Sequence, residues 1–413
     1  MRPDLHTVRA LAVELHGRRI GVINRLAGDQ HIFAFEEDYI EDPERPALSL
    51  SFKGSGGELV SSIRRQSARL PPFFSNLLPE GHLRRYLAER AGVKQQREFF
   101  LLAALGADLP GAVVVSPHDH TSEPERAPKG HDGDVEAEPD SALRFSLAGV
   151  QLKFSAIQEA NGGLTIPVDG MGGSWIVKLP DMRFAAVPEN EFAMLELARA
   201  IGIDVPATKL LPIEEIQGLP EDATSLKGNA LAIERFDRGP ANQRVHMEDF
   251  AQVFGAFPDD KYEGHSYANI AAVLRAEIGD EGTGEFVRRL VFTVLIGNGD
   301  MHLKNWSLLY PDQRTPILAP AYDFVSTVPY MAKDKLGLSF GKSRSLSGIT
   351  KDQVRRFTDT ARLPVSPIWE LTGETTARTL DAWRSLDAKD VLPSDIRGLI
   401  NQQIENAAAG VDN

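Results

Sequence analysis

The segment GNGDMHLKNWSLLY contains, within a span of six residues, four side chains able to assist phosphoryl transfer. They are a carboxylic acid, an imidazole, an amine and a carboxamide: Asp300, His302, Lys304 and Asn305. Phosphoryl transfer needs positioned metal ions, a cation near the phosphates and a carboxylate near the attacking hydroxyl. Protein kinases place that carboxylate and a metal-binding asparagine on one loop with four residues between them. Asp300 and Asn305 have this spacing.

Further residues suited to the same chemistry follow the order found in protein kinases. Asp323, in AYDFVS, comes after a short predicted hairpin, at the place of a second metal-binding acid. Earlier in the chain, IVKLP carries a lone lysine, Lys178, and the predicted helix after it carries Glu191. The glycine-containing segment SLAGVQLK precedes them, and ALAIERF follows as a predicted hinge between lobes. Each feature alone is common, but their order predicts a phosphoryl-transfer site.

Metal-dependent hydrolysis and serine hydrolysis fit the sequence less well. Asp300 and His302 as zinc ligands would need two further ligands, and no HExxH or similar spacing supplies them. The chain has no cysteine, which excludes disulfides, thiolate nucleophiles and cysteine-bound zinc. A GxSxG nucleophile elbow is also absent. His302 has a second interpretation, because a histidine near an aspartate commonly braces a loop through a hydrogen bond.

The composition is that of an ordinary globular protein, with 42% hydrophobic and 25% charged residues among 413. The net charge of −13 argues against a protein that holds DNA through its overall field. Arg64–Arg65 and Arg84–Arg85 are candidates for a local basic patch, although such pairs usually lie on solvated surface. No apolar run approaches the roughly 20 residues of a membrane span, and the first residues contain no apolar signal-peptide core. We therefore expect a cytoplasmic protein without membrane contact.

One compositional break divides the chain. Residues 117–140 read PHDHTSEPERAPKGHDGDVEAEPD, which predicts an acidic, proline-rich linker or loop. Residues 1–116 predict a β-rich region, with a hairpin at His16–Gly17, a strand at ALSLSF, a helix after LPPFFSN and a strand at GAVVV. Residues 141–236 predict a small lobe of strands with one helix, and residues 237–413 predict a mostly helical lobe.

Hydrophobic patterns predict the elements that position the polar side chains. RFSLAGVQLKFSAI alternates as a half-buried strand, with Phe154 and Ala156 on its apolar face. In SWIVKLP, Lys178 falls on the face opposite the apolar residues, and PENEFAMLELARAIG follows as a helix ending near Gly202. GEFVRRLVFTVLIGN is a second helix, ending at Gly297, and WSLLY and TPIL flank PDQR as a hairpin. The four polar side chains between Asp300 and Asn305 are therefore predicted to lie on a loop between that helix and that hairpin.

The chain resembles HipA-type serine/threonine kinases, the toxin half of a bacterial toxin–antitoxin pair. The resemblance extends from about residue 10 to residue 330, in LPPFFSNLLPEG, RFSLAGVQLKFS, SWIVKLP, ENEFAMLELARAIGI, LAIERFDR, GNGDMHLKNWSLL and PAYDFVS. The Gly-Asn-x-Asp-x-His-x-Lys-Asn segment is the most specific of these. The resemblance implies an α+β, kinase-like fold of two lobes. The N-lobe would be β-rich and carry an extra N-terminal subdomain, and the C-lobe would be mostly helical.

The resemblance also implies a site for ATP and Mg²⁺. Asp300 would be the catalytic base with His302 and Lys304 beside it, and Asn305 and Asp323 would hold Mg²⁺ on the nucleotide phosphates. The residues implied in nucleotide binding are Ala148, Gly149, Val150, Gln151 and Lys153 of a loop over the phosphates, Lys178, the backbone of Glu234 and Phe236, His302, Lys304, Tyr322 and Asp323. The loop has the family's Ala-Gly-x-Gln-x-Lys form in place of the GxGxxG of other kinases.

Regulation, substrate and partner are implied by the same resemblance. The family autophosphorylates the serine just before the phosphate-covering loop, here Ser146, and the modified loop is then ejected. A phosphoserine adds a charge of about −1.5 to −2 beside an anionic nucleotide site, so repulsion would favour ejection. Family substrates are aminoacyl-tRNA synthetases, modified on a serine, so that translation stalls. The family partner is a small, HipB-like helix-turn-helix antitoxin, and the toxin reaches DNA mainly through it.

One segment departs from the family. The family often reads His-Gln-Glu-Asp where this chain has His246-Met247-Glu248-Asp249. The missing amide is expected to loosen a contact near the nucleotide or the catalytic loop.

Two functions from other classes stay open. A small-molecule phosphotransferase, such as an antibiotic or sugar kinase, shares the Asp-x-His-x-x-Asn pattern, and the spacing of Asp300 and His302 fits it equally well. LPPFFSNLLPEG and SLAGVQLK favour the protein kinase instead. A pseudokinase scaffold or co-repressor would bind partners through its fold alone. The intact Lys178, Asn305 and Asp323 argue against that function.

Overall fold

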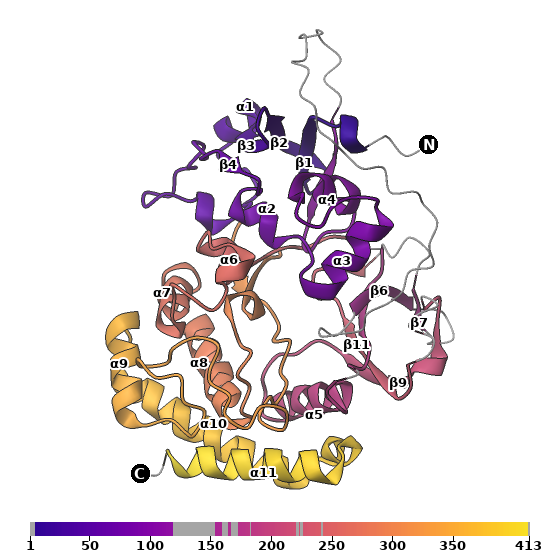
Figure 1. Ribbon diagram of the computed structural model, residues 1–413. Coiled ribbons are helices and arrows are strands. Elements are labelled where there is room, and N and C mark those ends of the chain that lie inside the picture. Colours follow the sequence, from indigo (N-terminus) through magenta and orange to yellow (C-terminus); the bar gives the residue numbers. More distant parts are fainter. Residues whose placement is uncertain are drawn as a thin grey trace.

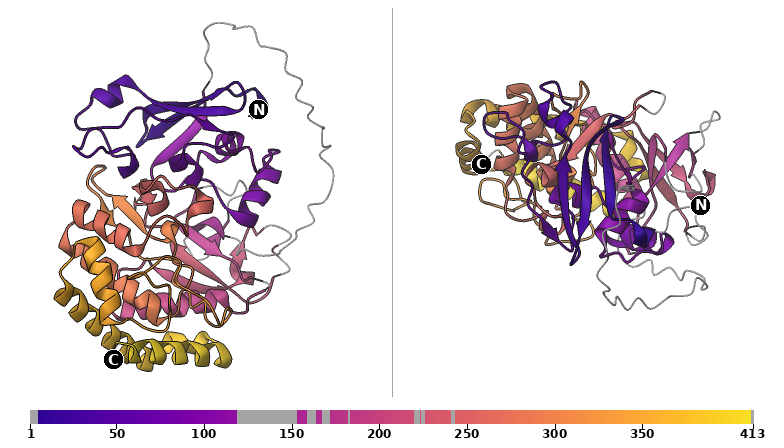
Figure 2. Two further views of the ribbon diagram at one scale, coloured as in Figure 1. Left: turned by 60° about the vertical axis from the view of Figure 1, so that its left-hand side comes forward. Right: turned by 90° about the horizontal axis from the view of Figure 1, so that it is seen from above.

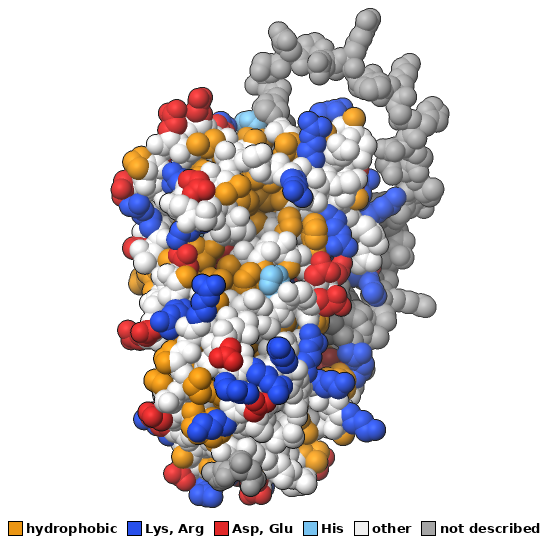
Figure 3. All heavy atoms as spheres, turned by 90° about the vertical axis from the view of Figure 1, so that its left-hand side faces the viewer, with side chains coloured by type: hydrophobic (Ala, Val, Ile, Leu, Met, Phe, Trp, Pro, Cys, Tyr) orange, Lys and Arg blue, Asp and Glu red, His pale blue; other side chains and the backbone are white. Residues whose placement is uncertain are grey.

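The computed structural model describes residues 5–118, 153–158, 164–166, 172–181, 183–219, 223, 226–240 and 243–411. Figure 1 shows three parts, which are an N-terminal sheet with its helices, a second sheet, and a helical part that includes the C-terminus. The views of Figure 2 place the N-terminal sheet over one end of the other two parts. Among the described helices, none is long and apolar enough to cross a bilayer. Acidic and basic side chains are mixed with apolar ones on the face shown in Figure 3.

The N-terminal part is built on a five-stranded antiparallel sheet in the order β4-β3-β2-β1-β5. The predicted hairpin is present, and His16 and Gly17 both adopt the positive φ that a tight two-residue turn needs. The predicted strand at GAVVV is also confirmed, as β5. The elements are β1 Ala10–Leu15, β2 Arg18–Leu26, β3 Gln30–Phe35, α1 Glu37–Glu41, β4 Gln66–Ser67, α2 Pro72–Asn76, α3 Gly81–Arg90, α4 Glu98–Leu105 and β5 Val113–Pro117.

The prediction of a strand at ALSLSF is wrong. Residues 47–49 lie outside any strand, and Leu50–Phe52 form a short 3-10 helix. The Ser49 hydroxyl caps this turn by accepting from the amide of Ser51 at 3.1 Å, a local bond that competes with strand pairing. The carbonyl of Leu48 and the amide of Leu50 bind side chains of the helical part, as described below. Period-two alternation here reflects burial of Leu48 and Phe52 at a junction between parts of the molecule.

The second sheet has six strands in the order β10-β7-β6-β8-β11-β9. Its buried face carries Phe154, Ala156, Trp175 and Val177, which pack in one cluster with Tyr86 of α3. Alternation therefore places Lys153 and Lys178 on the opposite face, as predicted for Lys178. The strands are β6 Lys153–Gln158, β7 Leu164–Thr165, β8 Trp175–Lys178, β9 Thr208–Pro212, β10 Ile216–Gln217 and β11 Asn229–Glu234.

The helical part begins with a helix that also contacts the second sheet, α5. Its remaining helices and the sheet β12-β13-β14 enclose the largest apolar cluster. The elements are α5 Val187–Ala200, β12 His246–Asp249, α6 Phe250–Val253, α7 Tyr267–Glu277, α8 Asp280–Leu295, β13 Ser307–Tyr310, β14 Ile317–Leu318, α9 Lys351–Ala361, α10 Val365–Ser385 and α11 Ser394–Ala409. The helix predicted over GEFVRRLVFTVLIGN and the hairpin at PDQR are both present, as α8 and β13–β14.

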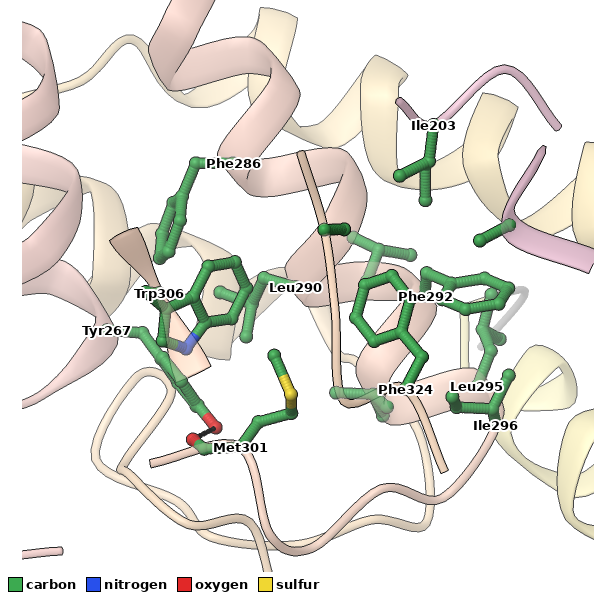
Figure 4. Close-up of a cluster of buried hydrophobic side chains, with 14 of the residues drawn as sticks. Ile203, Tyr267, Phe286, Leu290, Phe292, Leu295, Ile296, Met301, Trp306 and Phe324 are labelled. Carbon is green, nitrogen blue, oxygen red and sulfur yellow. Dashed lines mark hydrogen bonds between the residues drawn. The ribbon is translucent and has the colours of Figure 1, made fainter. Parts of the chain in front are cut away.

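The apolar cluster supports the loop between α8 and β13 from beneath. In Figure 4 the side chains of Phe286 and Leu290, from α8, lie beside Trp306 at the far end of that loop. Met301 of the loop itself is buried, and its carbonyl accepts a hydrogen bond from the Tyr267 hydroxyl at 2.7 Å. The loop is therefore anchored by an apolar core, which leaves its polar side chains on the other side.

Candidate active site

The polar loop between α8 and β13 forms one wall of a cleft of about 1890 Å³. All three parts of the molecule contribute to the cleft: Glu80 from the N-terminal part, Lys153 and Lys178 from the second sheet, and Asp300 from the helical part. The predicted site residues that line it are Lys153, Lys178, Glu191, Glu234, Phe236, Asp300, His302, Lys304, Asn305, Tyr322 and Asp323. Ser146, Ala148, Gly149, Val150 and Gln151 lie outside the described residues.

Lys178 connects the two lobes across this cleft. Its ammonium lies 2.5 Å from a carboxylate oxygen of Glu191 on α5 and also donates to Asp323. Burial alone would lower the pKa of Lys178, but the charges of Asp323 and Glu191 outweigh it and raise the pKa above its ordinary value. Burial opposes the ionised form of Asp323, but Lys178 and Lys153 lower its pKa below the ordinary value. The lysine is therefore held charged between two acids.

Lys153 is the cross-strand neighbour of Lys178, because β6 and β8 pair with these two residues opposite each other. Both ammonium groups thus extend from one face of the sheet toward the cleft. The surrounding protein partly desolvates Lys153, which lowers its pKa, and the charge of Lys178 lowers it further against the opposing charge of Asp323. Two adjacent cations of this kind suit an anionic ligand such as a phosphate group.

Asp300 is fixed mainly through its backbone. Its amide donates to the Asn298 side chain at 3.0 Å, and its carbonyl accepts from the amide of His302 at 2.9 Å and the Asn305 side chain at 2.9 Å. Its carboxylate accepts a hydrogen bond from the Tyr262 hydroxyl. Desolvation in the cleft raises the pKa of Asp300, against the opposing effect of the Tyr262 hydrogen bond.

Asn305 and Asp323 provide two oxygen donors to the cleft. The side-chain nitrogen of Asn305 donates to the Asp300 carbonyl, which orients the carboxamide. No hydrogen bond to its side-chain oxygen is found within the described part of the chain. Asp323 adopts a positive φ of 56°, and its carbonyl accepts from Asn298 at 3.0 Å. The described residues contain no cluster of three or more His, Asp or Glu side chains that could hold a metal by themselves. One carboxylate and one amide oxygen, completed by water and phosphate, fit Mg²⁺, which is seldom bound by an all-protein cage.

Lys304 is bonded to neighbours in the protein, whereas the imidazole of His302 makes a ring contact and its Nδ1 is buried without a hydrogen-bond partner among the described residues. Burial, reinforced by Lys261, lowers the pKa of His302 to about 3, so its imidazole is neutral at physiological pH. The ring lies edge-on to Tyr262, with 5.0 Å between ring centroids. Lys304 donates to the carbonyl of Asn76 at 3.0 Å and lies 2.8 Å from Glu80, both from the N-terminal part. A neutral imidazole is unsuited to act as a general acid, and the described residues show no hydrogen bond by which its ring would brace the loop.

The far end of the cleft has an apolar wall. The ring of Phe236 faces that of Tyr322, with 5.6 Å between centroids. The Tyr322 hydroxyl is held by the carbonyl of Lys304 at 2.8 Å and by Ser307 at 2.5 Å. The amide of Phe236 forms no hydrogen bond with another described residue. An aromatic wall beside an unpaired backbone amide, at the end of β11, is suited to a planar base such as adenine.

A buried ionic network that the sequence did not predict flanks Phe236 along the chain. Asp237 accepts from Arg235 at 2.8 Å, from Arg238 at 2.8 Å and from the amide of Gly111 at 2.8 Å. Asp108 of the N-terminal part accepts from Arg238 at 2.9 Å. The run RFDR looked like the charged end of a strand, but it joins the predicted hinge to the N-terminal part.

Glu80 and Tyr262 were missed as well. Glu80 lies 2.7 Å from Lys261 and 2.8 Å from Lys304, so the N-terminal part contacts the catalytic loop. Burial opposes the ionised form of Glu80, but these two lysines lower its pKa to about 2. The motif LPPFFSNLLPEG contains Glu80 and was the available signal. Tyr262 lies in a polar loop and carried no sequence signal.

The segment His246-Met247-Glu248-Asp249 forms β12 and joins the helical part to the N-terminal part. Nε2 of His246 lies 2.7 Å from the carbonyl of Leu48. Glu248 accepts from Ser49 at 2.5 Å, from the amide of Leu50 at 2.9 Å and from Tyr310 at 2.5 Å. Met247, which departs from the family pattern, lines the cleft.

The stability of the protein is expected to fall between pH 4.5 and pH 7 because of Glu248. Burial raises the pKa of Glu248 from 4.5 to about 7 in the folded state, although three hydrogen-bond donors oppose the shift. The folded state therefore binds more protons than the unfolded state in this window, so stability is lost as pH rises. Glu248→Gln should remove a pH-dependent loss of stability of about 3 kcal/mol across this window. Urea unfolding of both proteins at pH 5 and pH 8 measures it, and identical pH dependence would contradict the assignment.

Comparisons with known proteins agree with this geometry. The family model of the HipA N-terminal domain matches residues 11–116, and that of the HipA-like C-terminal domain matches residues 145–383. Y4dM of Sinorhizobium fredii, whose name assigns it provisionally to the kinases, is 51% identical over 381 residues, which cover 92% of each chain. The serine/threonine-protein kinase toxin HipA of Shewanella oneidensis is 26% identical over 400 residues, covering 87% of this chain and 86% of the toxin.

A solved structure shares the fold. It is that of a Shewanella oneidensis toxin–antitoxin complex of HipA, HipB and operator DNA. The matched chain superposes with a TM-score of 0.73 at 22% identity and covers 97% of this chain and 98% of that one. The chain therefore belongs to the HipA family, which includes serine/threonine-protein kinase toxins, and it has the kinase-like α+β fold predicted from its sequence.

Proposed function

We propose that this protein is an ATP-dependent serine/threonine protein kinase that arrests growth as a toxin. The observation that carries the proposal is the position of Lys178, bonded to both Glu191 and Asp323 in the cleft that Asp300 also lines. A kinase needs this lysine–glutamate pair and the metal-binding aspartate in place together. The relatives named as kinases support the same reaction.

Each side chain has a distinct role in the proposed reaction. Asp300 would accept the proton of the attacking hydroxyl, and Lys178 and Lys153 would bind phosphate oxygens. Asn305 and Asp323 would hold Mg²⁺, which neutralises charge on the phosphates when bound. The apolar wall of Phe236 and Tyr322 would receive the adenine. Lys304 would keep the catalytic loop against the N-terminal part, because its ammonium already has partners there.

The proposed substrate and self-regulation rest on the resemblance to the family. We propose an aminoacyl-tRNA synthetase, modified on a serine, as the protein substrate, which places the reaction in the cytoplasm. We propose autophosphorylation of Ser146 as the step that switches the kinase off. A small helix-turn-helix antitoxin of the HipB type is the proposed partner, supported by the solved HipA, HipB and operator DNA complex. Contact with DNA through that partner fits a chain of net charge −13.

Two substrate panels distinguish this proposal from its alternatives. Purified aminoacyl-tRNA synthetases and a set of sugars and aminoglycosides are each incubated with the protein and Mg-ATP, and the products are identified by mass. We expect phosphoserine on one synthetase and no modified small molecule. A phosphorylated sugar or aminoglycoside without any phosphoprotein would establish the small-molecule phosphotransferase. Nucleotide binding without any transfer, including to Ser146, would favour the scaffold.

A further inference from the structure

Tyr262 makes the hydrogen bond that an acceptor hydroxyl would have to make. Its hydroxyl donates to a carboxylate oxygen of Asp300, the proposed catalytic base. In a kinase, the hydroxyl that attacks the phosphate gives its proton to this carboxylate. Among the described residues, Tyr262 is the one side chain that donates to the Asp300 carboxylate. The Tyr262 hydroxyl thus makes the hydrogen bond to Asp300 that the hydroxyl of a substrate serine would make.

The tyrosine lies outside the cleft that would hold the nucleotide. Asp300 and His302 line the cleft, but Tyr262 is not among the described residues that do. Its side chain is half-exposed and lies edge-on to His302. A protein substrate has to bring its hydroxyl to the Asp300 carboxylate, to which the Tyr262 hydroxyl already donates.

The backbone of Asp300 does not need the tyrosine to be held in place. Three backbone hydrogen bonds, to Asn298, His302 and Asn305, already fix its position in the loop. The preceding residue is held as well, because the amide of Gly299 donates to the Thr327 hydroxyl at 2.9 Å. The hydrogen bond from Tyr262 therefore acts on the carboxylate of Asp300 and is not needed to hold the backbone of the loop.

The backbone that carries Tyr262 is anchored, so a change of its side-chain rotamer would move the ring alone. The carbonyl of Tyr262 accepts from Arg344 at 2.6 Å, and the carbonyl of Lys261 accepts from the amide of Leu303 at 3.1 Å. A rotamer change of a half-buried side chain at the surface needs no movement of the backbone. The hydroxyl can therefore leave Asp300 and return while the segment stays in place.

We propose that Tyr262 is a gate over the catalytic base, which keeps Asp300 from activating water until the hydroxyl of a protein substrate displaces the tyrosine. The inference rests on the proposed kinase function. With the gate open and no substrate present, a water oxygen would bond to the γ-phosphorus and the bond from that phosphorus to the ADP oxygen would break. One water proton would pass to Asp300, and ADP and inorganic phosphate would leave.

The test uses the full-length protein with Mg-ATP alone, and measures the release of inorganic phosphate together with the phosphate transferred to Ser146. Tyr262→Phe removes the hydroxyl and keeps the ring on His302. We expect phosphate release to rise about tenfold or more, since a hydrogen bond to a charged group is worth at least that factor. The KM for ATP should stay unchanged, because Tyr262 does not line the cleft.

A control removes a different tyrosine hydroxyl, that of Tyr267 at the start of α7. Tyr267→Phe deletes the bond to the carbonyl of Met301 and leaves the Asp300 carboxylate untouched, so it should not raise phosphate release. Unchanged or lower release in Tyr262→Phe, with a wild type that modifies Ser146, would overturn the gate and leave the kinase standing. If neither wild type nor variant transfers phosphate to any acceptor although ATP binds, the proposed kinase function fails and the gate fails with it.

Discussion

Replacing Asp300 with asparagine is expected to lower ATP-dependent phosphate transfer by about 100- to 10,000-fold, the usual contribution of a positioned general base. Asparagine has the shape of aspartate and keeps an oxygen that can accept from Tyr262. The backbone hydrogen bonds of residue 300 do not involve its side chain. The loss should therefore be chemical, in kcat, without a change in fold.

Two controls separate chemistry from binding in this experiment. The affinity for Mg-ATP, measured by calorimetry, should stay within a few-fold of wild type, because Asp300 is assigned to the acceptor hydroxyl. Asp259→Asn removes a nearby surface carboxylate, paired with Arg69 at 2.7 Å and 75% exposed, and should leave transfer unchanged. Equal rates of phosphate transfer by the wild type and Asp300→Asn would show that Asp300 takes no part in the reaction.

Replacing Asp237 with asparagine is expected to destabilise the protein by about 3–5 kcal/mol, the usual cost of removing one partner from a buried ion pair. Burial opposes the ionised form of Asp237, but Arg235 and Arg238 lower its pKa below the ordinary value. The substitution would leave both guanidinium groups buried with Asp108 as their remaining acid. Urea unfolding followed by circular dichroism measures the loss.

An exposed pair on α9 provides the matched control for Asp237. Asp352 lies 2.7 Å from Arg355 and 2.5 Å from Arg356, and all three side chains are well exposed. Solvent screens such pairs, so the urea midpoint of Asp352→Asn should stay close to that of the wild type. Similar losses for Asp237→Asn and Asp352→Asn would mean that the buried network does not stabilise the hinge.

Local patterns predicted the elements that carry the catalytic side chains. Alternation in SWIVKLP placed Lys178 on the polar face of its strand, and helical spacing ended α8 before the loop of Asp300. These features depend on a few neighbouring residues, so the sequence contains them. ALSLSF alternates equally well but forms no strand, because Leu48 and Leu50 give their backbone groups to His246 and Glu248, almost 200 residues away. Pairing over such distances is not visible in a local pattern.

The contacts that connect the parts of the molecule were the ones that could not be predicted. Glu80 reaches Lys304 across more than 200 residues of sequence, and Asp108 reaches Arg238 across 130. Tyr262 is an ordinary loop tyrosine in the sequence, and only the folded chain brings its hydroxyl to Asp300. Charged and hydroxyl side chains of this kind have the composition of solvated surface, and tertiary packing decides which of them become buried partners.

Peptide mapping after incubation with Mg-ATP tests the central claim most directly. The wild-type protein is incubated alone, digested and analysed by mass spectrometry, with Asp300→Asn treated in parallel. The kinase account predicts phosphate on Ser146 in the wild type and none in Asp300→Asn. Wild-type protein that binds ATP and carries no phosphate on any residue, and that also modifies no synthetase, would contradict it.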